Sequence, residues 1–122
     1  MKPFLLVAFG GALGSIARYG LSLLLNGKSF PWATLSVNIV GSFIIGVVAA
    51  IALANENFNN QWRLLLATGI CGGFTTFSAF TLENLQLIQE GKWLQMATYT
   101  SLSLLGGLIA VWLGYKIGSL AM

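Results

Sequence analysis

The sequence predicts an all-α membrane protein in which four helices cross the bilayer and the third is broken near its middle. Of the 122 residues, 57% are hydrophobic and only 7% are charged, and the mean hydropathy is +0.83. These values lie outside the range of soluble domains. Residues 31–55, 64–82 and 93–115 are uncharged, and residues 3–27 contain one charge. Each stretch approaches or exceeds the roughly 20 residues that a helix needs to cross the bilayer core.

Polar connections define the first two spans. The first span, 4–25, ends at the polar residues 26–29. Pro31 then precedes the second span, 32–54, and proline favours the beginning of a helix. The second span ends at the asparagine-rich connection 55–61, which is too short to form a domain outside the membrane.

The third and fourth spans are separated by a short polar turn. The third span, 63–90, contains a stretch of glycines and hydroxyl residues that interrupts its helix, and the turn at 90–92 leads to the fourth span, 94–116. The four spans fill the chain. We therefore expect a single four-helix transmembrane domain over residues 1–122.

Positive charges are almost balanced between the two sides of the membrane. Four spans place Lys2, Arg63 and Lys116 on one side, and Lys28 and Lys92 on the other, where Arg18 lies not far inside the membrane. The positive-inside rule needs an imbalance to fix the orientation. Two interpretations stay open: a small protein that simply has few charges, or a chain that inserts both ways and assembles as an antiparallel pair. So few helices leave little room for a pathway inside one copy, which favours an oligomer.

Composition also limits the partners and the chemistry. The net charge of +3 suits anionic lipid headgroups and does not indicate nucleic-acid binding. The chain contains no histidine and a single cysteine, Cys71. Histidine-based metal sites and histidine-dependent acid–base catalysis are therefore improbable, and an enzyme is not expected. Cys71 is interpreted as a small packing residue.

Small residues at four-residue spacing predict close contacts between helices. The pairs are Gly10 and Gly14, Ser42 and Gly46, and Gly114 and Gly118. Such pairs let two helix backbones approach each other in a membrane. We interpret all three as packing faces.

Polar side chains inside the spans are few and expensive in lipid, so each needs a partner or a water-filled cavity. Asn38 lies in the middle of the second span, on one helix face with Ser42. Its amide either clamps a neighbouring helix or lines a pore. Arg18 either anchors the first span at its depth or attracts anions to a vestibule. Glu83 either guards a pathway or is a paired carboxylate near the helix end.

The stretch from Gly72 to Phe80 is the most informative one. Glycine pairs weaken helices, and the hydroxyls of Thr75 and Thr76 can bond to nearby backbone, which predicts a non-helical turn. Irregular backbone at membrane depth survives only where it is buried in protein or faces a polar pathway. Free carbonyls from two such turns across a symmetric interface would suit a hard cation such as Na⁺.

Phenylalanines follow the predicted turn at every third residue. Phe77 and Phe80 fall on neighbouring parts of one helix face. The edge of an aromatic ring is electropositive and can accept an anion without offering a full charge. The alternative is that the phenylalanines only pack against other helices.

Three stretches resemble the signatures of the Fluc (CrcB) family of fluoride channels. They are GGALGSIARY at 10–19, TLSVNIVGSF at 34–43 and GGFTTFSAF at 72–80. The resemblance covers essentially the whole chain, in the family's order and spacing. It implies a fluoride-selective channel of the inner (plasma) membrane. Such a channel exports cytoplasmic fluoride passively down its electrochemical gradient and protects the cell from fluoride toxicity.

The resemblance also implies an antiparallel, dual-topology homodimer with two fluoride pathways along its interface. Phe77 and Phe80 would flank the pathway, and Asn38 would donate a hydrogen bond to fluoride. The backbone carbonyls of Gly72 and Thr75, duplicated by the second subunit, would hold a central structural Na⁺.

Further roles follow from the same resemblance. Arg18 would lie near the vestibule, and Glu83 at the end of the pathway. Tyr99 and Ser103 would begin a track of hydroxyls along the pore, and Gly107 stands where the next hydroxyl is expected.

Position 79 departs from the family, which usually has threonine there, whereas this chain has Ala79. The hydrogen-bond donor near the phenylalanines would then come from Thr76 or Ser78.

Two other functions are compatible with four short helices. A proton-coupled multidrug exporter needs a carboxylate inside its first helix, and the first span has none. A non-transporting subunit of a larger membrane complex would use Asn38 and the phenylalanines for packing alone, and it would conduct no ions when purified.

Overall fold

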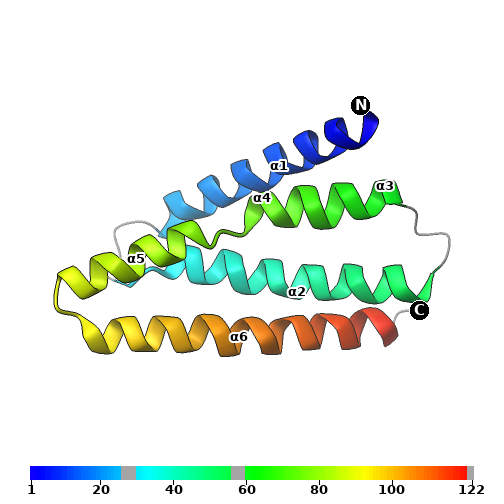
Figure 1. Cartoon of the computed structure of the whole chain (residues 1–122). Helices are drawn as coiled ribbons and strands as arrows, with labels where there is room; N and C mark the ends of the chain where they lie inside the picture. The colour runs from blue at the N-terminus through cyan, green and yellow to red at the C-terminus, as the bar shows by residue number, and fades with distance from the viewer. Residues whose placement is uncertain (26–29, 56–59, 121–122) are drawn as a thin grey trace.

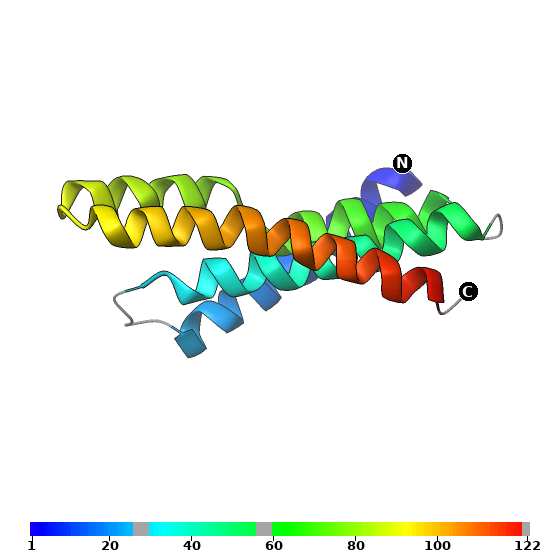
Figure 2. The ribbon, with the colours of Figure 1, turned by 90° about the horizontal axis from the view of Figure 1, so that it is seen from below.

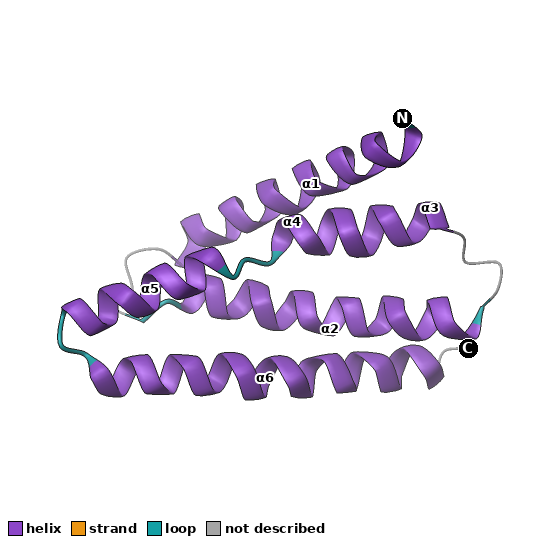
Figure 3. Ribbon diagram, in the orientation of Figure 1, coloured by secondary structure: helices purple, strands orange, loops and turns teal. Residues whose placement is uncertain are grey.

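The computed structural model describes residues 1–25, 30–55 and 60–120. Almost all of these residues are helical, as Figures 1 and 3 show. Four helical stretches in the described part are long and apolar enough to cross a membrane. The predicted fold class, an all-α membrane protein with a broken third span, is confirmed.

The ends of the helices lie close to the predicted ones. The first two spans are α1, Lys2–Leu25, and α2, Trp32–Ala54. The third span consists of α3, Asn60–Arg63, the π-helix η1, Leu64–Cys71, the short α4, Gly72–Phe74, and α5, Ser78–Gln89. The fourth is α6, Trp93–Leu120, which extends four residues beyond its predicted end. Lys28, one of the positive charges assigned above to the two sides of the membrane, lies outside the described residues.

The interruption of the third span begins later than the glycine pair suggests. Gly72 and Gly73 are still helical, and the backbone N–H of Gly72 donates to the carbonyls of Ala67 and Gly69. The chain becomes extended at Thr75, with φ −86° and ψ 160°. The break therefore falls within the predicted stretch from Gly72 to Phe80, at its threonines and not at its glycines. Gly73 allows close packing, because a Cβ there would collide with the backbone of Gly11, whereas a Cβ on Gly72 would meet only the carbonyl of Ala67, at 3.8 Å.

Two pairs of helices make up the bundle. α2 and α6 run side by side along the lower part of Figure 1, and α1 crosses the half of the third span formed by η1 and α4. Figure 2 shows α5 beside the first half of α6, to which it is joined by a tight turn. Gly91, in that turn, has a φ of 76°, a conformation that favours glycine.

Glycines set the spacing within both pairs. A Cβ on Gly14 would collide with the backbone of Ile70 and Phe74, and a Cβ on Gly114 would collide with the carbonyl of Phe43. The small-residue spacing predicted these contacts, and Gly10, Gly46 and Gly118 are buried in the same way. Ser42 differs, because it faces a groove described below.

Tryptophans mark the two ends of the spans. Trp32 and Trp93 begin α2 and α6 at one end of the bundle, and Trp62 and Trp112 lie toward the other end. All four side chains are exposed on the surface of the bundle. Exposed tryptophans at both ends and exposed leucines between them are the surface that a bilayer requires.

Candidate functional site

The non-helical residues 75–77 interrupt the third span near the middle of the bundle. Thr75 ends the first half: its backbone N–H and its hydroxyl both donate to the carbonyl of Cys71, at 3.0 and 2.8 Å. Thr76 begins the second half, because its Oγ1 accepts a hydrogen bond from the backbone N–H of Ala79 at 3.2 Å. A threonine that accepts in this way acts as the cap of the following helix, here α5. The hydroxyls therefore stabilise both ends of the break.

Asn38 holds the middle of the break from α2. Its Nδ2 donates to the carbonyl of Thr76 at 3.1 Å, and its Oδ1 accepts from the backbone N–H of the same residue at 2.9 Å. Both polar backbone groups of Thr76 are thus satisfied at membrane depth, as the low dielectric there requires. A primary amide has two N–H groups. One N–H of Asn38 therefore remains for another acceptor.

Because of these bonds, two backbone carbonyls lack the N–H donor that a continuous helix would give them. In a continuous helix the carbonyl of Gly72 would accept from the N–H of Thr76, and that N–H is bonded to Asn38. The carbonyl of Thr75 would accept from the N–H of Ala79, and that N–H is bonded to the Thr76 hydroxyl. Gly72 and Thr75 both line the groove described next. Uncharged oxygens of this kind are the ligands that a hard cation such as Na⁺ accepts, so the two residues fit the predicted cation site.

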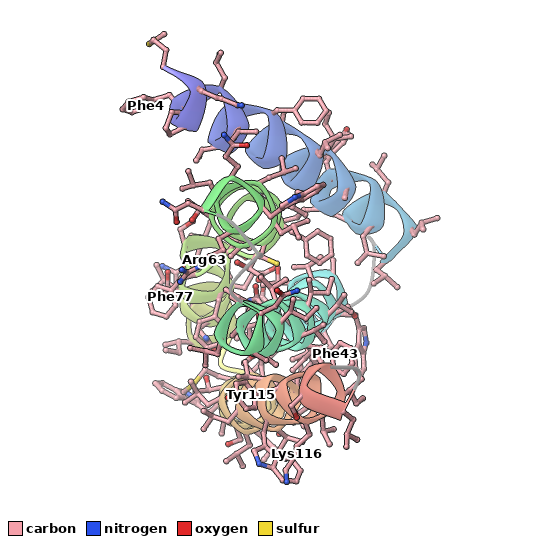
Figure 4. All side chains as sticks on the ribbon, turned by 90° about the vertical axis from the view of Figure 1, so that its right-hand side faces the viewer. Phe4, Phe43, Arg63, Phe77, Tyr115 and Lys116 are labelled. Carbon is pink, nitrogen blue, oxygen red and sulfur yellow. The ribbon has the colours of Figure 1, made fainter. Side chains whose placement is uncertain are left out.

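An open groove of about 340 Å³ runs over the break between α2, the third span and α6. Its polar or aromatic lining residues are Asn38, Ser42, Thr75, Thr76, Phe77, Phe80 and Ser103. Phe77 is 74% exposed, and Figure 4 shows it at the outer edge of the bundle. The ring centroids of Phe77 and Phe80 are 5.8 Å apart. The groove therefore combines two neighbouring rings with several neutral hydrogen-bonding groups.

Ser103 has an unusual place in this groove. Its Oγ is buried, and it has no hydrogen-bond partner within the described residues. A buried hydroxyl without a partner costs free energy, so such a group usually faces a water or a ligand. Ser103 is the one predicted track residue that lines the groove from α6.

Glu83 and Tyr99 lie outside the groove, between α5 and α6. The Tyr99 hydroxyl donates to Glu83 Oε1 at 2.9 Å, and the Tyr99 side chain is fully buried against the rings of Phe30 and Phe80. One residue further along each helix, the hydroxyl of Thr100 donates to Asn84 at 3.2 Å. The sequence analysis did not single out Asn84, although an amide inside a span is itself a signal.

Arg18 lies on the opposite side of the break from the groove. Its Nε donates to the carbonyl of Gly73 at 3.3 Å. It also lines a second cavity, of about 380 Å³, together with Thr34, Thr76 and Ala79. Ala79 therefore faces the cavity beside α1 and α2. The hydroxyl of a threonine at this position would not point into the groove of Phe77 and Phe80.

Of the predicted pathway residues, Ser78 is the most peripheral. It is exposed, and its Oγ lies 3.4 Å from the Thr76 hydroxyl, with either group as donor. The structure thus brings Asn38, Thr76, Phe77, Phe80 and Ser103 together in one groove with Gly72 and Thr75, the residues predicted to bind a cation. It leaves Ser78, Glu83, Tyr99 and Arg18 around that groove.

Comparison with known proteins identifies the family that this chain resembles. The model of the family described as "CrcB-like protein, Camphor Resistance (CrcB)" matches residues 5–115. A protein of Leptospira interrogans serovar copenhageni is 49% identical over 88% of this chain and 87% of its own length. A protein of Thermus thermophilus is 46% identical over 97% of this chain and 96% of its own length. One of Chlorobium phaeobacteroides is 48% identical over 93% and 90%. All three are named "Fluoride-specific ion channel FluC".

Proposed function

This chain belongs to the CrcB-like family, and on that basis we propose that it is a fluoride-specific channel of the plasma membrane. It is a multi-pass membrane protein and not an enzyme. Fluoride crosses it passively, so the electrochemical gradient drives fluoride out of the cell and keeps its cytoplasmic concentration low. The match over nearly the whole chain supports this function.

The groove over the break is the observation that favours fluoride in particular. Fluoride is small and strongly hydrated, so a pore must replace its water with close donors. A full positive charge in the pore would hold the ion too tightly to release it. The groove offers the remaining amide N–H of Asn38, the hydroxyl of Ser103 and the rings of Phe77 and Phe80. We assign these residues to the pathway because amides, hydroxyls and ring edges attract an anion without trapping it.

The pathway continues from the groove along the third and fourth spans. Tyr99 lies one helical turn from Ser103 on α6, and Glu83 accepts its hydroxyl. We place these two residues at the outer part of the pathway. Thr76 and Ser78 supply hydroxyls where the chain enters α5.

Arg18 belongs to a vestibule on the other side of the break. Its guanidinium donates to Gly73 through Nε alone, so its other N–H groups are available to an anion in the second cavity. The neighbouring Thr34 is buried and polar. A positive charge at a vestibule raises the local anion concentration without lying in the narrow part of the path.

A second copy of the chain completes the proposed channel. Phe77 lies at an open edge of the bundle, and one subunit leaves the groove uncovered on that side. An antiparallel partner related by a twofold axis would bring a second pair of Gly72 and Thr75 carbonyls to the first, and the four oxygens would hold Na⁺ as a structural ion. The small difference in positive charge between the two ends suits insertion in both orientations.

Fluoride efflux from liposomes that contain only this protein tests the function. We expect fluoride to leave wild-type liposomes and chloride to be retained. Phe77→Ile should abolish the fluoride flux, while Phe4→Ile should preserve it, because Phe4 is equally exposed but lies near the start of α1. Equal fluoride and chloride fluxes would contradict selectivity. The absence of any flux would favour a structural subunit of a larger complex.

A further inference from the structure

A second groove lies between α2 and the beginning of the third span. It has a volume of about 300 Å³ and is lined by apolar side chains of α2 from Ile45 to Leu53, by Ala67 of η1 and by Arg63. We call it the Arg63 groove. Along α2 it extends about 12 Å, at 1.5 Å per residue. Its walls are apolar toward the middle of the membrane and positively charged at the end where α2 finishes and α3 begins.

The position of Arg63 at the start of the third span indicates a depth near the boundary between phospholipid headgroups and acyl chains. Arg63 is the last residue of α3, at the start of the third span, and its neighbour Trp62 is 53% exposed on the bundle surface. Exposed tryptophans concentrate at this depth of a bilayer. Figure 4 places Arg63 apart from Lys116, the basic residue of α6 at the same end of the bundle.

The charge of Arg63 is not neutralised by the described part of the chain. The one ion pair found there joins Lys92 to Glu90, at 3.2 Å. Arginine binds phosphate especially well, because its planar guanidinium can donate two parallel hydrogen bonds. An uncompensated guanidinium above an apolar groove therefore complements a ligand with an anionic head and a hydrocarbon tail.

We propose that the Arg63 groove binds one anionic phospholipid, with the phosphate at Arg63 and an acyl chain along α2 toward Ile45. The site adjoins the groove over the break, and the two share Ile45 and Ala67 as walls. The end of the acyl chain therefore lies beside the central groove. This binding does not depend on the proposed transport function.

A second copy of the chain is a poorer match for Arg63 than a lipid. The chain has three acidic residues, of which Glu56 lies outside the described part. Glu90 is paired with Lys92, and Glu83 accepts the hydroxyl of Tyr99. Glu90 therefore already has a cationic partner, and Glu83 is half-buried beside Tyr99, so neither offers an exposed, unpaired carboxylate to Arg63 of another copy. Phospholipid phosphate is abundant at this depth and supplies the missing charge.

Native mass spectrometry of the full chain, purified in detergent and mixed with equal amounts of phosphatidylglycerol and phosphatidylcholine, tests the proposal. We expect the wild-type protein to retain phosphatidylglycerol about five-fold better, since one basic residue near a membrane surface contributes on the order of that factor. Arg63→Gln should remove the preference. Lys116→Gln is the matched control and should keep it, because Lys116 lies over the Trp112 ring, away from the groove.

A second pair of variants tests the apolar half of the site. Ala49→Trp fills the Arg63 groove without changing its charge and should reduce lipid retention, whereas Ala97→Trp, on the surface of α6, should not. Glycerol phosphate, which has the phosphate but no chains, should fail to displace the lipid. Three results would overturn the proposal: an unchanged preference in Arg63→Gln, displacement by glycerol phosphate, or an Ala49→Trp variant that alters the oligomeric state but not lipid retention.

Discussion

At the scale of single residues, the Asn38 amide has a structural task and leaves room for a functional one. From the sequence, Asn38 is either a helix clamp or a pore residue. The structure shows the clamp, because two hydrogen bonds hold the backbone of Thr76. The amide also lines the groove, where its second N–H remains for an anion. The two roles are therefore compatible, and variants can separate them.

Asn38→Ala should lower the apparent unfolding temperature in detergent and abolish fluoride flux. Each backbone group of Thr76 that loses its partner costs about 1–3 kcal/mol. The matched control is Asn84→Ala, because Asn84 also makes two hydrogen bonds but lies outside the groove. That variant should lose a similar amount of stability and still conduct. Wild-type flux through folded Asn38→Ala would restrict Asn38 to the clamp.

Ser103→Ala should reduce fluoride flux without reducing stability. The Ser103 hydroxyl is buried and unpartnered within the described residues, so removing it costs no hydrogen bond inside the chain. Losing one donor to an anion should slow flux by about ten-fold, which corresponds to roughly 1.4 kcal/mol. Flux assays and thermal unfolding of Ser103→Ala and of the exposed Ser101→Ala measure both effects. A marked loss of stability with normal flux would show that the hydroxyl bonds within the protein.

At the scale of secondary-structure elements, the existence of the break in the third span was predictable from the sequence, but its position was not. Length and hydropathy predicted the span, and the cluster of glycines and hydroxyls predicted its interruption. Within the predicted stretch from Gly72 to Phe80, the break begins at Thr75. Its position depends on Asn38, which lies 38 positions away and takes the N–H of Thr76 from the helix. A contact between distant residues of this kind is not encoded in local propensity.

Close packing between α1 and the first half of the third span is a second property of the elements. Gly14→Ala should lower the apparent unfolding temperature, because its Cβ would collide with the backbone of Ile70 and Phe74. Forced overpacking of this kind typically costs about 1–3 kcal/mol. Gly20→Ala is the matched control on the same helix.

Among the described residues, no atom outside the adjoining part of α1 lies within 4 Å of the position of a Cβ on Gly20. The control should therefore leave stability unchanged or raise it by up to about 1 kcal/mol, since alanine is the better helix former. Thermal unfolding of both variants in the same detergent measures the difference. Equal destabilisation by the two substitutions would contradict a close contact at Gly14.

At the scale of the whole molecule, much of the candidate site was predictable because the chain is short and strongly patterned. Hydropathy located the four spans, and the polar residues inside them included those that meet at the groove. The side of the break that each residue faces was not predictable. Arg18 and Ala79 lie near the break in the structure, but both face the cavity beside α1. The side that each of these residues faces is decided by the crossing of α1 over η1 and α4. This crossing depends on backbone contacts between distant glycines.

Sodium should stabilise the assembled channel. If the Gly72 and Thr75 carbonyls of two copies enclose Na⁺, its replacement by a large organic cation at constant ionic strength removes a ligand of the folded dimer. The apparent unfolding temperature and the fraction of dimer should then fall, and returning Na⁺ should restore both. Light scattering and thermal unfolding in the two buffers measure this. Identical behaviour in both would count against the cation site.

The interruption of the third span has an electrical consequence. In a continuous helix the peptide dipoles are aligned and add up, so partial charges remain only at its two ends. The non-helical residues 75–77 create two additional ends in the middle of the bundle. The segment that finishes at α4 presents the negative pole of its carbonyls there, and α5 presents the positive pole of its first N–H groups. One short stretch of chain therefore offers opposite partial charges side by side, so that a cation and an anion can each be favoured there, and Arg18 already donates to one carbonyl of the negative end, that of Gly73.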